Sequence, residues 1–226
     1  MEKLRRVFLA ALFMGFAALP LEAEGFFSRL SWFAEGSILF FLEDNDVADS
    51  APMPILPSLG AGASYPLTDT LRLELTLDFY TTHYHFHSGL NRPVPVEIEN
   101  RTARVMGFLL GFQAARPFDI TPNFTLRAYG GLAADIRLVL VAAGLEAHED
   151  MREIRRNTAN VRRYFWSQGR WLLPVIGVGA DYTLDSGLML GFDFRVWMPA
   201  YRLWTGENLP AVEGWRLGPG IRLTFR

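Results

Sequence analysis

The sequence contains no cysteine among its 226 residues. A chain without cysteine has neither disulfide bonds nor thiolate chemistry, so we expect its stability to come from the packing and closure of its sheet. It also lacks a charge excess, because its formal net charge at pH 7 is only −2. Nucleic-acid-binding proteins carry a clustered positive excess, and the sequence therefore predicts no nucleic-acid partner.

A long apolar run is also missing. The best candidate, VFLAALFMGFAAL at residues 7–19, is shorter than the roughly 20 residues that a membrane-spanning helix needs. It follows Lys3, Arg5 and Arg6 and precedes the small residue Ala23, which is the pattern of a secretory signal peptide cleaved after Ala23. We therefore expect residues 1–23 to be removed and residues 24–226 to form one domain, since no low-complexity linker divides them.

Instead of a long apolar run, the sequence contains segments in which apolar and polar residues alternate. The stretch LRLELTLDFYTTHYHFH from Leu71 places leucines on one parity and Arg72, Glu74 and Asp78 on the other, which predicts a strand with two unlike faces. Eight such segments recur, near residues 30–42, 58–65, 71–79, 105–114, 124–138, 172–182, 188–198 and 215–225. Because bacterial membrane barrels have an even number of strands, the sequence predicts an all-β fold, an eight-stranded antiparallel transmembrane β-barrel in up-and-down order.

An exported β-sandwich is the alternative, since it also alternates strands and turns. Two features favour the barrel. Segments of about nine or more alternating residues exceed the usual five or six of a soluble strand and match a tilted spanning strand. Ionised groups also occur at mid-strand on the less apolar parity, where a barrel encloses them.

The lengths of the connections predict the orientation. Residues 66–69, 117–123 and 183–187 are short and rich in Pro, Asp, Asn and Gly, as expected of tight periplasmic turns. Longer polar stretches at residues 43–54, 88–100, 142–163 and 203–213 predict extracellular loops, with the barrel in the outer membrane of a diderm bacterium. Within residues 144–163, the spacing of Glu149, Arg152, Glu153 and Arg156 predicts a short helix on the rim.

In each predicted strand, every second residue faces the lipid and the residues between them face the interior. These interior positions hold acids and arginines in equal number. An eight-stranded barrel is only wide enough for its own interior side chains, so we predict a paired structural network and not a catalytic site. The predicted members are Glu35, Arg72, Glu74, Asp78, Arg127, Asp135, Arg137, Asp181, Asp193, Arg195, Arg216 and Arg222.

Towards the predicted extracellular end, the inward parity becomes apolar and aromatic. Such a cup above a charged floor is a candidate pocket for a small hydrophobic molecule, and the alternative is that loops fold down and fill it. The predicted lining residues are Leu39, Phe41, Tyr84, Phe86, Val139, Trp197 and Tyr201.

Three stretches, LRAYGGLAADI, VIGVGADYTLDSGLMLGFDFRVWM and the closing GPGIRLTF, resemble the OmpW family of small eight-stranded outer-membrane proteins. The resemblance implies uptake of small hydrophobic compounds through an apolar interior that opens sideways into the membrane. It also implies contact with membrane lipids and with the outer-membrane barrel assembly machinery. The final residue departs from the usual aromatic ending of such barrels, because Arg226 follows Phe225.

Other chemistry is less well supported. His83, His85 and His87 share one strand face, which raises the question of a zinc or copper site, but they have the leucine parity and fit an outward interfacial rim better. The acidic run from Glu43 lacks the glycine and the terminal glutamate of a calcium loop, so no cofactor is expected. No serine motif marks a nucleophile, so a lipid-modifying enzyme ranks below a small-molecule conduit and below a structural or adhesive surface barrel.

Overall fold

The computed structural model describes residues 28–43, 54–96, 103–141, 151–205 and 214–225. The chain divides into two compact units, Met1–Leu30 and Ser31–Arg226. The second unit holds every strand described below. The predicted signal peptide and its cleavage site lie outside the described residues.

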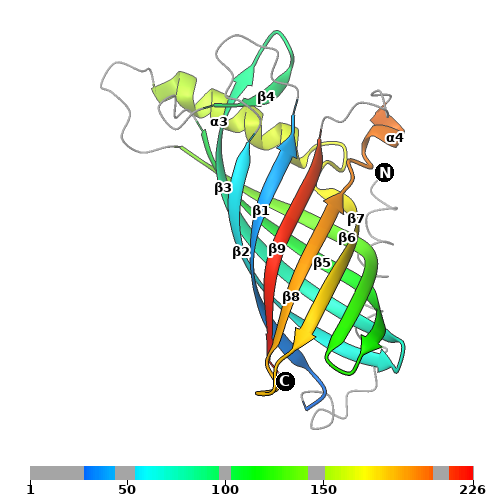
Figure 1. Cartoon of the computed structure of the whole chain (residues 1–226). Helices are drawn as coiled ribbons and strands as arrows, with labels where there is room; N and C mark the ends of the chain where they lie inside the picture. Colours follow the sequence, from blue (N-terminus) through cyan, green and yellow to red (C-terminus); the bar gives the residue numbers. More distant parts are fainter. Residues whose placement is uncertain (1–27, 44–53, 97–102, 142–150, 206–213, 226) are drawn as a thin grey trace. The chain divides into compact units, whose positions relative to one another are not determined.

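Eight long strands form a closed antiparallel barrel, as the alternation predicted (Figure 1). Each strand pairs with the next along the chain, and β1 completes the ring by pairing with β9. The strands are β1 (Ser31–Leu42), β2 (Ile55–Thr68), β3 (Leu71–His87), β5 (Ala103–Thr121), β6 (Phe124–Leu140), β7 (Leu172–Thr183), β8 (Met189–Trp197) and β9 (Trp215–Phe225).

The wall separates two environments because successive side chains point to opposite faces of a strand. Large apolar side chains project outward and are exposed, while the alternate positions are buried in the interior. This pattern suits a barrel whose outer surface meets hydrocarbon. Outward residues include Trp32, Leu59, Leu77, Phe112, Val178, Phe192 and Ile221. No helix within the described ranges is both long and apolar enough to cross a membrane.

One end of the barrel, here the turn end, has short connections. Only residues 122–123 separate β5 from β6, so the predicted turn over residues 117–123 is wrong for Pro117 and the four residues after it. These residues extend β5, where Asp119 pairs with Thr125 and accepts a hydrogen bond from its hydroxyl at 2.7 Å. Pro117 is tolerated because the β3–β5 ladder has already ended at Ala115, which makes β5 a local edge.

The opposite end, here the helical end, carries three elements besides the long strands (Figure 1). The prediction of a loop over residues 88–100 is wrong in part, because β4 (Arg92–Pro95) returns along β3 and pairs with its last residues, Tyr84 to His87. Prolines at positions 93 and 95 obscured this strand in the sequence, yet an edge strand accepts them. A single helical turn, α4 (Arg202–Thr205), follows β8.

The third element is α3 (Met151–Trp166), and it confirms the helix predicted in this part of the chain. Its apolar side chains Ile154, Val161 and Phe165 are buried, while five arginines project from its exposed face. Asn157 fixes the helix to the barrel by accepting a hydrogen bond of 2.7 Å from the backbone N–H of Phe86. The exposed arginines are Arg152, Arg155, Arg156, Arg162 and Arg163.

Candidate functional site

The interior nearest the turn end is filled by an ion-pair group that we call the Arg127 cluster. Arg127 on β6 contacts Asp181 on β7 and Asp193 on β8, the latter at 3.0 Å. On the other side, Arg222 makes two hydrogen bonds of 3.0 and 3.1 Å to Glu74. All five side chains are buried. Each of the three carboxylates is thus paired with an arginine, and such pairing is the condition under which buried ions are tolerated.

The middle of the barrel holds the Arg195 cluster. Arg195 on β8 forms ion pairs with Glu35 on β1 and with Asp78 on β3, the second at 3.1 Å. In the ring of eight strands, β8 and β3 are four positions apart in either direction, so this contact crosses the full bore. Arg195 is only 2% exposed. A solute travelling along the axis would therefore have to break a buried ion pair.

Towards the helical end lies the Asp135 cluster. One oxygen of Asp135 accepts hydrogen bonds of 2.6 Å from both Arg137 and Arg216, and the other accepts one of 2.8 Å from the hydroxyl of Tyr80. Two guanidinium groups thus share one carboxylate. Arg72 was predicted to belong to the same interior network, but it is half-buried near the turn end, where its register partners are Pro66 and Ala115.

Six of the seven residues predicted to line an apolar cup belong to two packed layers. Leu39, Phe41 and Trp197 belong to the first layer, together with Tyr80 and Leu173. In the second layer, Tyr84 is buried, Phe86 and Val139 pack beside it, and α3 adds Val161 and Phe165. The rings of Tyr84 and Phe165 meet edge to face, with 5.0 Å between their centroids. The seventh residue, Tyr201, is buried at 8% exposure.

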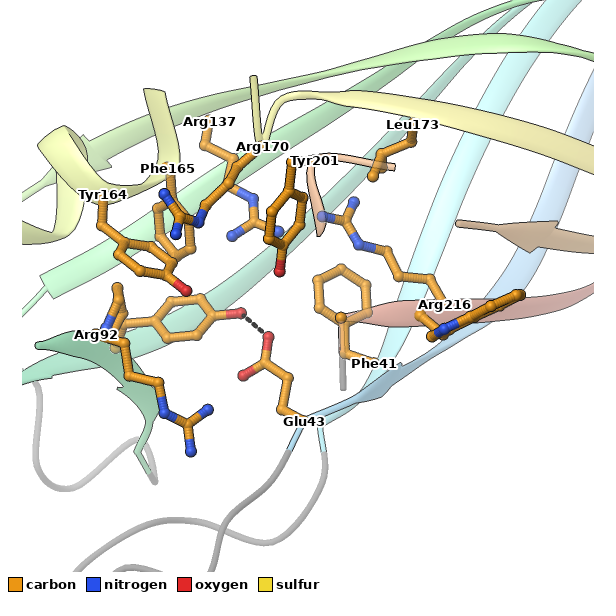
Figure 2. A pocket seen from close by; sticks show the side chains of 14 residues that line it. Phe41, Glu43, Arg92, Arg137, Tyr164, Phe165, Arg170, Leu173, Tyr201 and Arg216 are labelled. Carbon is orange, nitrogen blue, oxygen red and sulfur yellow. Dashed lines mark hydrogen bonds between the residues drawn. The ribbon is translucent and has the colours of Figure 1, made fainter. Parts of the chain in front are cut away.

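A small cavity of about 50 Å³ remains between these layers, and we call it the chamber (Figure 2). Four arginines line it, each from a different part of the chain, together with Glu43 and several aromatic rings. Arg137 lies 3.9 Å from the centroid of the Phe165 ring, and Arg216 lies 4.5 Å from that of Phe41. The four arginines are Arg92, Arg137, Arg170 and Arg216.

Among the described residues that line the chamber, Glu43 is the acidic one. It follows the last residue of β1 and accepts a hydrogen bond of 2.9 Å from the hydroxyl of Tyr84 (Figure 2). Burial raises the pKa of the Glu43 carboxyl above its usual value, although Arg137 and the Tyr84 hydrogen bond oppose this shift. The remaining acids of the predicted acidic run, Asp44, Asp46 and Asp49, lie outside the described residues.

The three histidines are near the β4 hairpin. His85 is exposed, and His83 and His87 are half-buried. His87 accepts a hydrogen bond of 3.1 Å from the backbone N–H of Leu90, which holds the turn between β3 and β4. Within the described part of the chain, no three His, Asp or Glu side chains are grouped so that they could hold a metal ion.

Several residues that line the chamber or lie near it were not predicted from the sequence. Tyr164, Phe165 and Arg170 lie at or beyond the end of α3, so strand parity gave no signal for them. Arg92 was hidden in a stretch taken for a loop. Tyr80 was not predicted either: it shares the parity of Asp78, but its hydrogen bond to Asp135 joins strands that are distant in sequence.

No family model matches the chain, and no curated protein matches it. Solved structures do. The outer membrane protein OprG from Pseudomonas aeruginosa is similar over 88% of this chain and 96% of its own, with 11% identity and a TM-score of 0.51. Neisserial surface protein A has 14% identity over 87% of this chain and 97% of its own, with a TM-score of 0.48. At such low identity the similarity to OprG shows a shared fold, that of a small outer-membrane barrel.

Proposed function

We propose that this protein is an outer-membrane barrel that is closed to ions and hydrophilic solutes along its axis and acts at its helical end. The observation that carries this proposal is the series of buried ion pairs across the bore, from Arg127 through Arg195 to Asp135. The helical end adds two packed apolar layers and the cap formed by α3. A structural or adhesive surface barrel needs a stable wall and an exposed end, and it needs no open bore.

Membrane contact is supported by the belt of exposed apolar side chains around the wall. The short connections at the turn end and the longer ones at the helical end support an orientation with α3 outside the cell. On that side, the exposed arginines of α3 would lie near anionic lipid headgroups, which attract basic side chains. Assembly would follow the usual outer-membrane route, with the barrel assembly machinery as partner.

Single-cysteine labelling tests the orientation, because the native chain has no cysteine to interfere. Arg156→Cys places a thiol on the exposed face of α3, and Asp185→Cys places one in the turn between β7 and β8. We expect a bulky polyethylene-glycol maleimide to label the first variant on intact cells and the second only after permeabilisation. The reverse pattern would invert the orientation.

Liposome swelling tests the closed bore for solutes. Proteoliposomes containing the refolded barrel should swell in iso-osmotic arabinose no faster than protein-free liposomes, whereas a general porin in parallel samples should give rapid swelling. Swelling that increases with the amount of inserted barrel would contradict closure.

A second candidate is the OmpW-like one, binding or conduction of small hydrophobic molecules. The observation in its favour is that β7 is shorter than β6 at the helical end. The β6–β7 ladder ends at Ala134 and Leu172, whereas β6 continues to Leu140. The indole of Trp166 covers this place by donating a hydrogen bond of 3.2 Å to the carbonyl of Arg137. A hydrophobic ligand would enter the layer around Phe41 and Trp197 and leave sideways past β6.

Tryptophan fluorescence separates the two candidates. A conduit should show saturable quenching by small lipophiles that is lost in both Trp197→Ala and Phe41→Asp and retained in Trp204→Ala, whose side chain is 56% exposed. Phe41→Asp is the informative variant, because it keeps every fluorophore. No saturable quenching in the parent would exclude the conduit and leave the surface barrel.

A further inference from the structure

A second cavity, of about 450 Å³, lies next to the chamber at the helical end, and we call it the outer pocket. The two cavities share Tyr164 and Arg170 as lining residues. The walls of the outer pocket come from β3, the turn before β4, α3, the turn after α3, and α4. Small-molecule sites have volumes of roughly 300 to 1,000 Å³, so the outer pocket is large enough for one sugar unit or a molecule of similar size.

Three carboxamide side chains line the outer pocket, each from a different element. Asn91 precedes β4, Asn160 is on α3, and Gln168 is in the turn after α3. Within the described part of the chain, none of the three makes a side-chain hydrogen bond. A carboxamide both donates and accepts hydrogen bonds, as a hydroxyl does. The three side chains are therefore suited to a ligand that carries several hydroxyl groups.

The backbone at two of these residues is unusual. Asn91 and Gln168 have φ angles of 52° and 56°, and they are the two non-glycine residues with positive φ in the ranges that the structure describes. Asparagine tolerates this left-handed conformation better than glutamine does. Gln168 is held in it by Trp204, whose indole N–H donates a hydrogen bond of 2.8 Å to the Gln168 carbonyl. Such strain persists where the surroundings impose it, and it is concentrated at binding sites.

Aromatic rings complete the wall of the outer pocket. The guanidinium of Arg170 lies 4.1 Å from the centroid of the Tyr164 ring and donates a hydrogen bond of 2.9 Å to the hydroxyl of Ser167 (Figure 2). The half-buried ring of Phe86 adds apolar surface from β3. A sugar ring has C–H groups on its faces and hydroxyls around its rim. It therefore matches apolar rings that are flanked by polar side chains.

Arg163 determines which kind of sugar fits best. Its side chain is exposed on α3 and lines the outer pocket, and it makes no ion pair within the described residues. A guanidinium in this position can pair with a carboxylate. We propose that the outer pocket binds an acidic sugar, with Arg163 on its carboxylate and the three carboxamides on its hydroxyls. The outer pocket does not involve the bore, so this proposal stands or falls separately from the closed barrel.

Saturation-transfer NMR on the refolded barrel tests the proposal with a matched pair of probes. Methyl β-D-glucuronide and methyl β-D-glucoside differ in one group, a carboxylate in the first and a hydroxymethyl group in the second. A polyoxyethylene detergent is used, because it has no sugar headgroup. We expect saturable binding of both probes, about three- to fivefold tighter for the glucuronide, since a partly exposed ion pair adds little. Binding of neither probe, or equal affinity for the two, would overturn the proposal.

Vesicles distinguish two sources of the sugar. The glucuronide titration is repeated with the barrel in phosphatidylcholine vesicles, with and without lipopolysaccharide. Loss of binding when lipopolysaccharide is present assigns the outer pocket to the acidic sugars of the membrane itself. Unchanged binding assigns it to a glycan from outside the membrane.

Three variants locate the binding. Arg163→Gln should lower the affinity for the glucuronide to that for the glucoside, and the glucoside affinity should stay unchanged. Asn160→Ala removes one hydrogen bond and should weaken both probes by about two- to tenfold. Arg162→Gln removes a neighbouring exposed arginine that is not among the residues lining the outer pocket, and it should change neither affinity.

The pattern across variants decides the outcome. A selective loss of glucuronide affinity in Arg163→Gln supports the outer pocket, because a misfolded barrel would lose both probes. Equal weakening by Arg162→Gln and Arg163→Gln would overturn the proposal and assign the binding to surface charge. Unchanged affinities in Asn160→Ala would also overturn it, provided that this variant keeps the gel shift between boiled and unboiled samples.

Discussion

At the scale of single residues, the interior depends on small side chains opposite large ones. Gly107 on β5 pairs with Tyr80 on β3, and a Cβ atom added to Gly107 would lie 2.0 Å from the Tyr80 ring. Gly218 gives Trp197 the same room, because a Cβ atom added to Gly218 would lie 2.7 Å from the Trp197 ring. Inward glycines therefore allow aromatic rings to lie against the wall, and Tyr80 in turn holds Asp135.

Gly107→Ala should destabilise the barrel by about 1 to 3 kcal/mol, because overpacking forces the buried Tyr80 ring to move. Gly36→Ala is the matched control, since a Cβ atom there meets nothing within 4 Å. We expect the control to stay within about 1 kcal/mol of the parent. Urea unfolding in lipid vesicles, followed by tryptophan fluorescence, measures both. Equal destabilisation by the two variants would show that the ring contact has no special role.

Glu43 gives the helical end a pH dependence whose sign follows from its raised pKa. Between the unfolded pKa of about 4.3 and the higher folded value, the folded state binds more protons than the unfolded state. Stability is therefore greatest below the unfolded pKa, and it falls as the pH rises through the folded pKa. We expect Glu43→Gln to flatten this fall in the unfolding midpoint, whereas Glu153→Gln, a change on the exposed face of α3, should follow the parent. A Glu43→Gln profile identical to the parent's at every pH would refute the assignment.

At the scale of elements, the long strands with repeated alternation could be predicted from the sequence, and the short or irregular elements could not. Alternation over many residues predicted all eight long strands, and opposed charges predicted a helix where α3 lies. The strand β4 was missed because it has four residues, two of them proline, and depends on the edge of β3 for its hydrogen bonds. The end of β5 was missed because Pro117 suggested a turn, whereas pairing with β6 continues past it.

The helix α3 should act as a separable cap. Phe165→Ala removes the contacts of the Phe165 ring with Tyr84 and Arg137. The backbone amides of α3 should therefore exchange hydrogen faster, while those of the strands remain protected. Arg162→Ala changes only an exposed side chain and should leave the exchange of α3 unchanged. Loss of protection throughout the barrel in Phe165→Ala would mean that the cap and the wall are a single cooperative unit.

At the scale of the whole molecule, closure into a ring determines which buried charges meet. Parity alone indicated that Arg195 and Asp78 both point inward. Their pairing across the bore depends on the stagger of eight strands and on residues 117 positions apart, which no local pattern encodes. The same holds for Arg222 and Glu74, whose separation is 148 positions. The sequence thus predicted the composition of the interior, and the fold determined its partners.

Ion conductance across a planar lipid bilayer is the most direct test of the closed bore. Barrels whose insertion is verified by the gel shift of unboiled samples should carry no steady current at either polarity, since the ion pairs of Arg127, Arg195 and Asp135 occupy the axis. Transient current during insertion would not bear on the bore. Steady single-channel currents that scale with the number of inserted barrels would contradict the closed barrel.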